Sequence, residues 1–510
     1  MKAKILFTAF MGLCLQSVSA QFHDGVDWKF GGGGFARVVF PPAPLFQAFT
    51  NGVIQTDRKI IGVSDRNIAR LDSNGTIDLT FGAKGYFADT LYHADGSILN
   101  KSAGDITFSG IEGLADGKIL ISGFARTDGP LLLFRLLPDG HLDKSFGKAG
   151  IICNDTFGMV RGLAAAVQAD NKIVVLGMSY DSLQVLVRYY ADGSIDSSFG
   201  TNGKVLNSLV SMSRKTDLEL LPDGRMLALG KNFNVARYMP DGSTDTSFNH
   251  SGIGFVIPDT AATFSRAMAV AADGKIWIGG SNEFRTPGPF TVGRLNTNGT
   301  ADSSLDSDGI INYPWKVGGD NKCSDILPLP DGKILLGGST GNPFDGTDNF
   351  ALLRVKADGT IDSSFGEYGR LITSVNFSGE MTAFIEKLLL QQDGKILAFG
   401  FSAISSESYG TIGRYYANGD LIDVSIDELL SSNNKISVYP NPANSKVYYN
   451  LPGNMQAAQL SLLNMQGQMM LHTNQPKQNE IETGNLPNGC YILRIRSGTA
   501  VFTQKLVIFH

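Results

Sequence analysis

Two short motifs recur in the same order along most of the chain, and this repetition constrains the fold more than any other feature of the sequence. The first motif is an Asp-Gly turn, or a close variant, followed by Lys or Arg and a short apolar strand. Its seven copies begin at Asp57, Asp116, Asp170, Asp223, Asp273, Asp331 and Asp393 and lie 50 to 62 residues apart. A β unit of this length, repeated so often, predicts a propeller or another stacked β array.

The second motif follows each copy of the first: a strand ending in Arg, an Asp/Asn-Gly turn, another Asp and usually Phe-Gly. Its clearest copy runs from Arg188 to Gly200. Two copies are degenerate, because Phe248-Asn249 and Leu305-Asp306 replace Phe-Gly. The seven arginines are Arg70, Arg135, Arg188, Arg237, Arg294, Arg354 and Arg414. Since nearly every repeat has the same carboxylates, we expect them to cap turns and pair with arginine, and not to catalyse a reaction.

Each unit holds four short apolar or alternating runs separated by Gly-containing turns, and no stretch keeps a helical period. The two ends of the region share one copy of the second motif: residues 24–31 carry its Asp and Phe-Gly half, and residues 414–419 carry its strand. A ring sealed between its ends produces this split, whereas an open array would carry capping repeats. We therefore predict an all-β chain with a seven-bladed β-propeller over residues 21–422, sealed where 22–36 meets 411–420.

The repeats resemble the delta-60 repeat family of bacterial proteins over residues 22–420, because both motifs recur in that family's order. The resemblance implies a propeller and very little about ligand or activity.

The last part of the chain has a different pattern. A polar linker is predicted at 423–435, and residues 436–510 hold about seven short strands, which predict a small Ig-like β-sandwich. This module resembles the C-terminal sorting domain of type IX secretion cargo from Bacteroidota. The residues that carry the resemblance include Tyr439, Pro440, Asn441, Pro442, Gly489, Tyr491 and Lys505. It implies partners in the type IX translocon and processing machinery, and a secreted or cell-surface location.

The start of the chain predicts export. Residues 1–20 have the charged, apolar and small-residue order of a signal peptide, and no later stretch reaches the roughly 18 apolar residues of a membrane span. Without the signal, 41 basic residues face 48 acidic ones, so a nucleic-acid partner is not expected. Cys153, Cys323 and Cys490 then remain, an odd number, and we interpret them as small buried hydrophobes with at most one bridge.

The search for chemistry gives no catalytic residue, no metal ligand set and no cofactor. The six histidines have no metal-ligand spacing, and no common hydrolase motif occurs. Two hypotheses stay open. The favoured one is a non-catalytic surface propeller that binds a glycan, a peptide or an envelope component through loops on one face. The alternative is a secreted hydrolase or lyase with its site over the central channel, which would need converging acids, bases or a metal there.

The loops that depart from the repeat predict where a ligand binds, because they can change without disturbing the core. They are His93 to Ser109, Asn282 to Phe290, Tyr313 to Cys323, Gly341 to Asn349 and Ser402 to Gly410. Among them, Tyr313, Trp315, Lys316, Phe344 and Asp345 offer aromatic faces beside polar groups, which suit sugars or extended peptides. The alternative for Trp315 is packing between blades.

Overall fold

The computed structural model describes strands and turns, and no helix occurs among the residues that it describes. These are residues 25–27, 29–40, 47–92, 96–99, 106–125, 130–154, 159–212, 215–256, 263–282, 288–315, 321–341, 347–375, 382–404, 407–417, 436–451, 459–464, 469–473, 479–497 and 500–510. The predicted signal peptide and the predicted linker lie outside these ranges. The all-β prediction is confirmed.

The repeat region forms antiparallel sheets that follow one another along the chain, here called blades. Blade 1 holds β2 (Asn51–Ile54), β3 (Ile60–Val63) and β4 (Ile68–Leu71), and blade 2 holds β7 (Ile106–Gly113), β8 (Ile119–Ala125), β9 (Leu131–Leu136) and β10 (Ile151–Asn154). Blade 3 holds β11 (Met159–Val167), β12 (Ile173–Ser179), β13 (Leu183–Tyr189) and β14 (Lys204–Ser211). Blade 4 holds β15 (Leu218–Leu220), β16 (Met226–Leu229), β17 (Asn234–Tyr238) and β18 (Ile253–Phe255).

The remaining blades have the same order. Blade 5 holds β19 (Thr263–Val270), β20 (Ile276–Asn282), β21 (Phe290–Leu295) and β22 (Ile310–Tyr313), and blade 6 holds β23 (Lys322–Pro328), β24 (Ile334–Gly341), β25 (Asp348–Val355) and β26 (Arg370–Thr373). Blade 7 holds β27 (Thr382–Leu390), β28 (Lys395–Ile404), β29 (Glu407–Tyr416) and β1 (Phe35–Val38). A hairpin of β5 (Leu91–Tyr92) and β6 (Ile98–Leu99) separates blades 1 and 2 along the chain.

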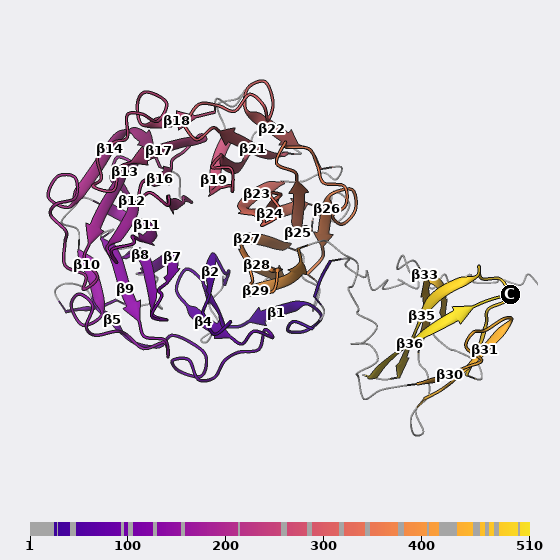
Figure 1. Ribbon diagram of the computed structural model, residues 1–510. Helices are drawn as coiled ribbons and strands as arrows, with labels where there is room; N and C mark the ends of the chain where they lie inside the picture. The colour runs from indigo at the N-terminus through magenta and orange to yellow at the C-terminus, as the bar shows by residue number, and fades with distance from the viewer. Residues whose placement is uncertain are drawn as a thin grey trace, which may run out of the picture.

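The blades form a closed ring, which Figure 1 shows face-on. The first strand of each blade contacts the first strand of the next one, in the order β2, β7, β11, β15, β19, β23, β27 and back to β2. These innermost strands therefore surround the centre of the ring. The arrangement is a β-propeller, and its sheets are compatible with the seven blades expected from the repeats.

The ring is sealed by strands from both ends of the repeat region. β1 pairs antiparallel with β29, with Phe35 opposite Gly413, and the backbone N–H of Asp27 donates to the carbonyl of Arg414 at 2.8 Å. Blade 7 therefore takes its outermost strand from the N-terminal segment. This contact between the N-terminal segment and the last repeat is the one that the split motif predicted.

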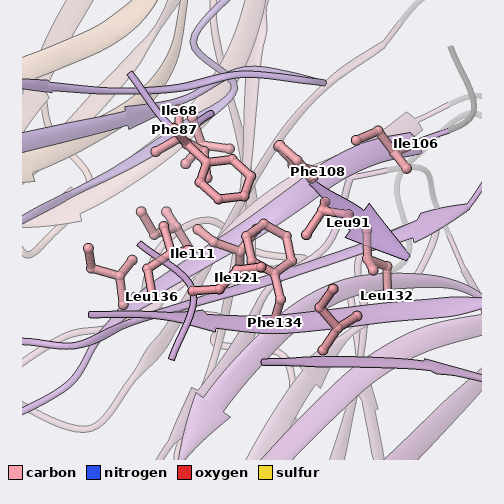
Figure 2. Close-up of a cluster of buried hydrophobic side chains, with 14 of the residues drawn as sticks. Ile68, Phe87, Leu91, Ile106, Phe108, Ile111, Ile121, Leu132, Phe134 and Leu136 are labelled. Atoms are coloured by element: carbon pink, nitrogen blue, oxygen red, sulfur yellow. The ribbon is translucent and has the colours of Figure 1, made fainter. Parts of the chain in front are cut away.

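The hydrophobic core lies between neighbouring blades. Figure 2 shows the cluster between blades 1 and 2, where Ile68 and Phe87 of one blade pack against Ile121 and Phe134 of the next. The Phe87 and Phe134 rings are stacked with centroids 5.4 Å apart. Each blade thus buries both faces of its sheet, which explains the nearly continuous apolar runs in the sequence. Cys153 and Cys323 are buried in such clusters.

Residues 436–510 form a separate pair of sheets. One sheet holds β30 (Ser437–Tyr439), β31 (Lys446–Asn450) and β34 (Glu480–Glu482), and the other holds β33 (Met469–Thr473), β32 (Gln459–Asn464), β35 (Gly489–Ser497) and β36 (Ala500–Ile508). Val447 and Tyr449 of the first sheet share a hydrophobic core with Leu462 and Leu493 of the second. Two antiparallel sheets around one core are compatible with the predicted Ig-like sandwich.

Candidate functional site

The repeated residues of the two motifs build a belt of arginine–aspartate pairs. In blade 3, Arg188 Nε lies 2.8 Å from Asp196 Oδ2, and Lys172 Nζ lies 3.3 Å from the same oxygen. Asp196 Oδ1 in turn accepts from the hydroxyl of Ser198 at 2.6 Å, and the guanidinium lies 4.6 Å from the centroid of the Phe199 ring. The Lys of the first motif therefore meets the Arg, the second Asp, the Ser and the Phe of the second motif in one cluster.

The same arginines also join each blade to the next one. Arg188 Nη1 donates to the carbonyl of Pro240 in blade 4, and Arg354 Nη1 bonds the carbonyl of Ala417 in blade 7. The last arginine, Arg414, pairs with Asp27 and donates to the carbonyl of Ser73 in blade 1 at 2.5 Å. The belt therefore runs around the whole ring, and its residues hold the fold together.

The two degenerate repeats keep this geometry by other means. Leu305 supplies no aromatic ring in blade 5, and there the indole of Trp277 lies 4.9 Å from the Arg294 guanidinium. Asn249, which replaces glycine in blade 4, keeps the left-handed backbone with φ of 46° that asparagine tolerates better than most residues. Trp277 thus serves packing, since it is 1% exposed.

The antiparallel order of the strands sorts all the turns onto two faces of the ring. Both motif turns, between the first and second strands and between the third and fourth, lie on what we call the repeat face. The other connections lie on the opposite face, here called the variable face. All five segments that depart from the repeat join strands on the variable face: His93 to Ser109, Asn282 to Phe290, Tyr313 to Cys323, Gly341 to Asn349 and Ser402 to Gly410.

The aromatic residues predicted to bind a ligand are packed where the structure describes them. Trp315 is 5% exposed, and its ring contacts Phe290 edge-on with centroids 5.0 Å apart. Tyr313 is also buried, and its hydroxyl donates to the carbonyl of Gly359 at 2.6 Å. Lys316, Phe344 and Asp345 lie outside the described residues. The binding surface stays a prediction. The contacts of Trp315 agree with the alternative, in which this residue packs inside the propeller.

The centre of the ring contains charged groups that no motif predicted. Lys387 Nζ of β27 lies 3.2 Å from Asp325 Oδ1 of β23, and the other carboxylate oxygen of Asp325 accepts from the backbone N–H of Leu388 at 2.6 Å. Asp217 accepts in the same way from the N–H of Met268 at 2.9 Å. Because an innermost strand is a sheet edge, some of its N–H groups face away from the sheet, and these two aspartates satisfy them from the neighbouring blade.

One ion pair crosses the centre of the ring. Lys215, which precedes β15 of blade 4, donates to the backbone carbonyl of Glu386 in blade 7 at 2.7 Å and pairs with its carboxylate at 2.8 Å. In the order of innermost strands around the ring, β15 of blade 4 and β27 of blade 7 are three positions apart, so they lie on opposite sides. The contact therefore ties two distant blades together across the axis.

Two further carboxyl groups lie within electrostatic range of Lys387. Burial raises the pKa of Glu112 to about 7, against the opposing effect of Lys387. Burial, with the nearby carboxylate of Asp217, raises the pKa of Glu219 to about 7. Burial alone would lower the pKa of Lys387, but Asp325 and Asp217 raise it above its usual range. The ring centre thus combines a fixed cation with carboxyl groups that titrate near neutral pH.

This arrangement predicts a stability that falls as pH rises. Glu112 and Glu219 have a higher pKa when folded than unfolded, so the folded protein binds the extra protons between about pH 4.5 and 7, and stability is lost across that window. Glu219→Gln should therefore be more stable than the parent by about 1–3 kcal/mol at about pH 8, and the gain should vanish near pH 4.5. Urea unfolding at several pH values measures this. Glu367→Gln, on an exposed residue, is the control, and a pH-independent gain would contradict the assignment.

The ring centre offers no metal centre among the residues described, since no three or more His, Cys, Asp or Glu side chains group together to hold an ion. The sequence did contain a signal for the charged cluster. Glu112 and Glu219 stand four residues before the aspartate of the first motif, where blades 3 and 5 have Ala166 and Ala269. A charged residue at a position of the innermost strand where other repeats have alanine therefore indicates a side chain at the ring centre.

The motif residues of the C-terminal unit lie around its last strand. The side chain of Asn441 accepts from the backbone N–H of Val507 at 2.8 Å, between the prolines Pro440 and Pro442. The hydroxyl of Tyr491 donates to the carbonyl of Pro487 at 2.6 Å. Tyr439 is half-exposed, and its ring lies 6.0 Å from that of Tyr448.

The two remaining residues of this motif lie in the last hairpin. Gly489 opens β35 and pairs with Ile508 in β36. Lys505 pairs with Ile492 through the backbone, and its side chain lies outside the described part of the chain. The motif thus joins the first strand of the unit to its last hairpin.

Known family models match both parts of the chain. Residues 437–509 match the secretion system C-terminal sorting domain. Residues 55–81, 114–146, 168–199, 221–248 and 329–365 match the β-propeller domain of unknown function DUF5122. The chain contains DUF5122 β-propeller repeats and a secretion-system sorting domain. This DUF5122 propeller is exported by the type IX system and is secreted or held at the cell surface. The degenerate blade 5, with Leu305, is outside the matched segments.

Solved structures similar to the DUF5122 propeller have diverse roles. A catalytically inactive virginiamycin B lyase from Staphylococcus aureus with quinupristin is 11% identical, with a TM-score of 0.43, over 74% of this chain and 98% of the lyase. PorZ, a surface component of the type IX system of Porphyromonas gingivalis, is 12% identical, with a TM-score of 0.30, over 91% of this chain and 75% of PorZ. At these scores the likenesses carry no information on function.

A comparison with curated protein sequences finds no match. Among the described residues, no helix is long and apolar enough to cross a membrane.

Proposed function

We propose that the exported propeller is a non-catalytic binding or adhesion module that holds a glycan or a peptide on its variable face. The observation that carries this proposal is the position of the five longest departures from the repeat: all of them connect strand ends on the variable face, and the Arg–Asp belt occupies the other face. A rigid ring whose longest variable connections share one face is suited to recognition, because changes there leave the blade-to-blade core intact.

The binding proposal is tested by Phe344→Ala in a glycan and peptide binding screen with the full chain. We expect about tenfold weaker binding and an unchanged melting temperature, since an aromatic face beside polar groups is lost from the β24–β25 connection. Tyr180→Ala is the matched control, because Tyr180 is 74% exposed on the short β12–β13 turn, which has no inserted residues. Equal effects of both changes, or no effect of Phe344→Ala, would remove this surface from the proposal.

Trp315→Ala has a different expected result. The indole is buried against Phe290, so its removal leaves a cavity and should lower the free energy of unfolding by about 3–5 kcal/mol. Binding should then be measured well below the lowered melting temperature. A stable Trp315→Ala protein that has lost binding would instead show direct contact with the ligand.

The second candidate is a hydrolase or lyase that works at the ring centre, and one observation favours it. Glu112 and Glu219 have pKa values raised by burial to about 7, where a carboxyl group can serve as general acid or base. If the parent turns over a bound glycan or peptide, and Glu219→Gln abolishes this turnover but retains binding, the protein is an enzyme. Binding without turnover in the parent supports the module.

A further inference from the structure

A cavity lies on the repeat face, at the seam where blade 7 meets blade 1. The cavity measures about 310 Å³. Small-molecule sites in proteins span roughly 300–1,000 Å³, so the cavity has room for one small ligand. Four of its lining residues are cationic and one is acidic, although the whole chain has a formal charge of −5. The seam therefore concentrates positive charge on an acidic protein.

Arg58 occupies an unusual backbone position in this lining. It is the second residue of the first-motif turn in blade 1, with φ of 68°, and its side chain is exposed. The other six copies have glycine or asparagine there, such as Gly117 and Asn171. A positive φ strains a residue that has a Cβ atom, and residues under such strain cluster at functional sites. Arg58 is thus a local exception to the repeat that adds a cation to the cavity.

Gln391 is the second exception in the lining. The residue is 8% exposed, and its Oε1 has no hydrogen-bond partner. Gln55 and Gln168 occupy the same position in blades 1 and 3, and there Oε1 accepts from Arg70 and Arg188, each at 3.3 Å. A buried acceptor without a donor costs free energy, and because this oxygen is almost fully covered in the free protein, a rotation of the amide must open it to a donor from a ligand.

The other cations at the seam have internal partners. Lys395 Nζ lies 3.1 Å from Asp393 and 3.4 Å from Asp27, and Arg414 pairs with Asp27 at 2.8 Å. These ion pairs hold Lys395 and Arg414 in place along the cavity, whereas Arg58 belongs to an exposed turn. An anion at Arg58 would complement the positive charge, and a hydroxyl on the same ligand would satisfy Gln391.

We propose that the seam pocket, with Arg58 and Gln391 as its two recognition groups, binds a small hydroxylated anion such as a sugar acid or a sugar phosphate. The anionic group pairs with the Arg58 guanidinium, which can hold two oxygens of a carboxylate or phosphate at once. A hydroxyl group donates to Gln391 Oε1. This pocket lies on the face opposite the variable one, so it is independent of the proposed function.

The test measures ligand binding to the full exported chain by calorimetry. The probes are D-glucuronate, glucose 6-phosphate, glucose and inorganic phosphate, at millimolar concentrations. We expect at least one of the two anionic sugars to bind, about tenfold or more tightly than both glucose and inorganic phosphate. The comparison of D-glucuronate with glucose 6-phosphate shows whether the pocket prefers a carboxylate or a phosphate group. Phosphate bound as tightly as either sugar would mean an adventitious ion only and would overturn the proposal, as would no binding of either sugar.

The variants separate recognition from folding. Arg58→Gly restores the residue of the other repeats, so it should weaken binding about tenfold or more while the melting temperature stays equal or rises. Asn171→Gly makes the same backbone change in blade 3 and should leave binding unchanged. Gln391→Met should weaken sugar binding without loss of stability, whereas Gln168→Met should lower stability and spare binding. Unchanged affinity in Arg58→Gly refutes the assignment.

Discussion

Replacing Arg188 by alanine is expected to lower the free energy of unfolding by about 3–5 kcal/mol, because it leaves a buried carboxylate without its main partner. Asp196 has no exposed side-chain surface, and it lies 2.8 Å from Arg188 Nε. The change also removes the hydrogen bond to Pro240 and the contact with the Phe199 ring, so it weakens the junction with blade 4. Urea unfolding of the full chain measures the loss.

The pH dependence of this loss tests its electrostatic origin. Burial acts to raise the pKa of Asp196, but bonds from Ser198, together with Lys172 and Arg188, hold it well below its usual range. Its stabilising contribution is therefore present above about pH 4, the unfolded value, and is lost as the pH falls below it. The difference between parent and Arg188→Ala should shrink in acid.

Lys172→Ala is the matched control for the arginine variant. Lys172 contacts the same oxygen of Asp196 but is partly exposed, so its removal should cost much less than the removal of Arg188. Ligand binding should be unchanged in both variants below their melting temperatures. Lost binding at unchanged stability in Arg188→Ala would contradict a structural role for the belt.

Deleting residues 436–510 is expected to abolish export beyond the periplasm. The sorting-domain match covers residues 437–509. The contacts that seal the ring, between β1 and β29 and between Asp27 and Arg414, involve no residue of this unit. The truncated chain should therefore fold and accumulate in the periplasm, with a near-total loss of surface or secreted protein. Cell fractionation with surface proteolysis measures its distribution.

A point variant gives the matched control for the deletion. Glu482→Gln changes an exposed side chain of β34, so the sorting unit should fold and the variant should reach the surface like the parent. The melting temperature of the propeller in the truncated protein should equal that of the parent. Normal surface levels of the truncated protein would show that the sorting assignment is wrong.

Much of the fold was determined by local sequence. The turns of both motifs need a positive φ at defined residues, and Gly193 and Gly224, with φ of 89° and 85°, supply it. Four apolar runs separated by such turns form a four-stranded antiparallel sheet. The ring closes because the two ends of the repeat region each hold one half of the second motif. The sorting domain was recognisable for a similar reason, because its motifs are contiguous in the chain.

The tertiary structure alone decided what meets at the centre of the ring and at its seam. Glu112, Glu219 and Lys387 come from three blades, and only closure of the ring brings their charges within range of one another. It likewise decided that Trp315 packs on Phe290, since sequence shows an aromatic residue but not which surface covers it. Turn chemistry acts between neighbours in the chain, whereas burial and electrostatics depend on distance in space, and only the folded ring sets those distances.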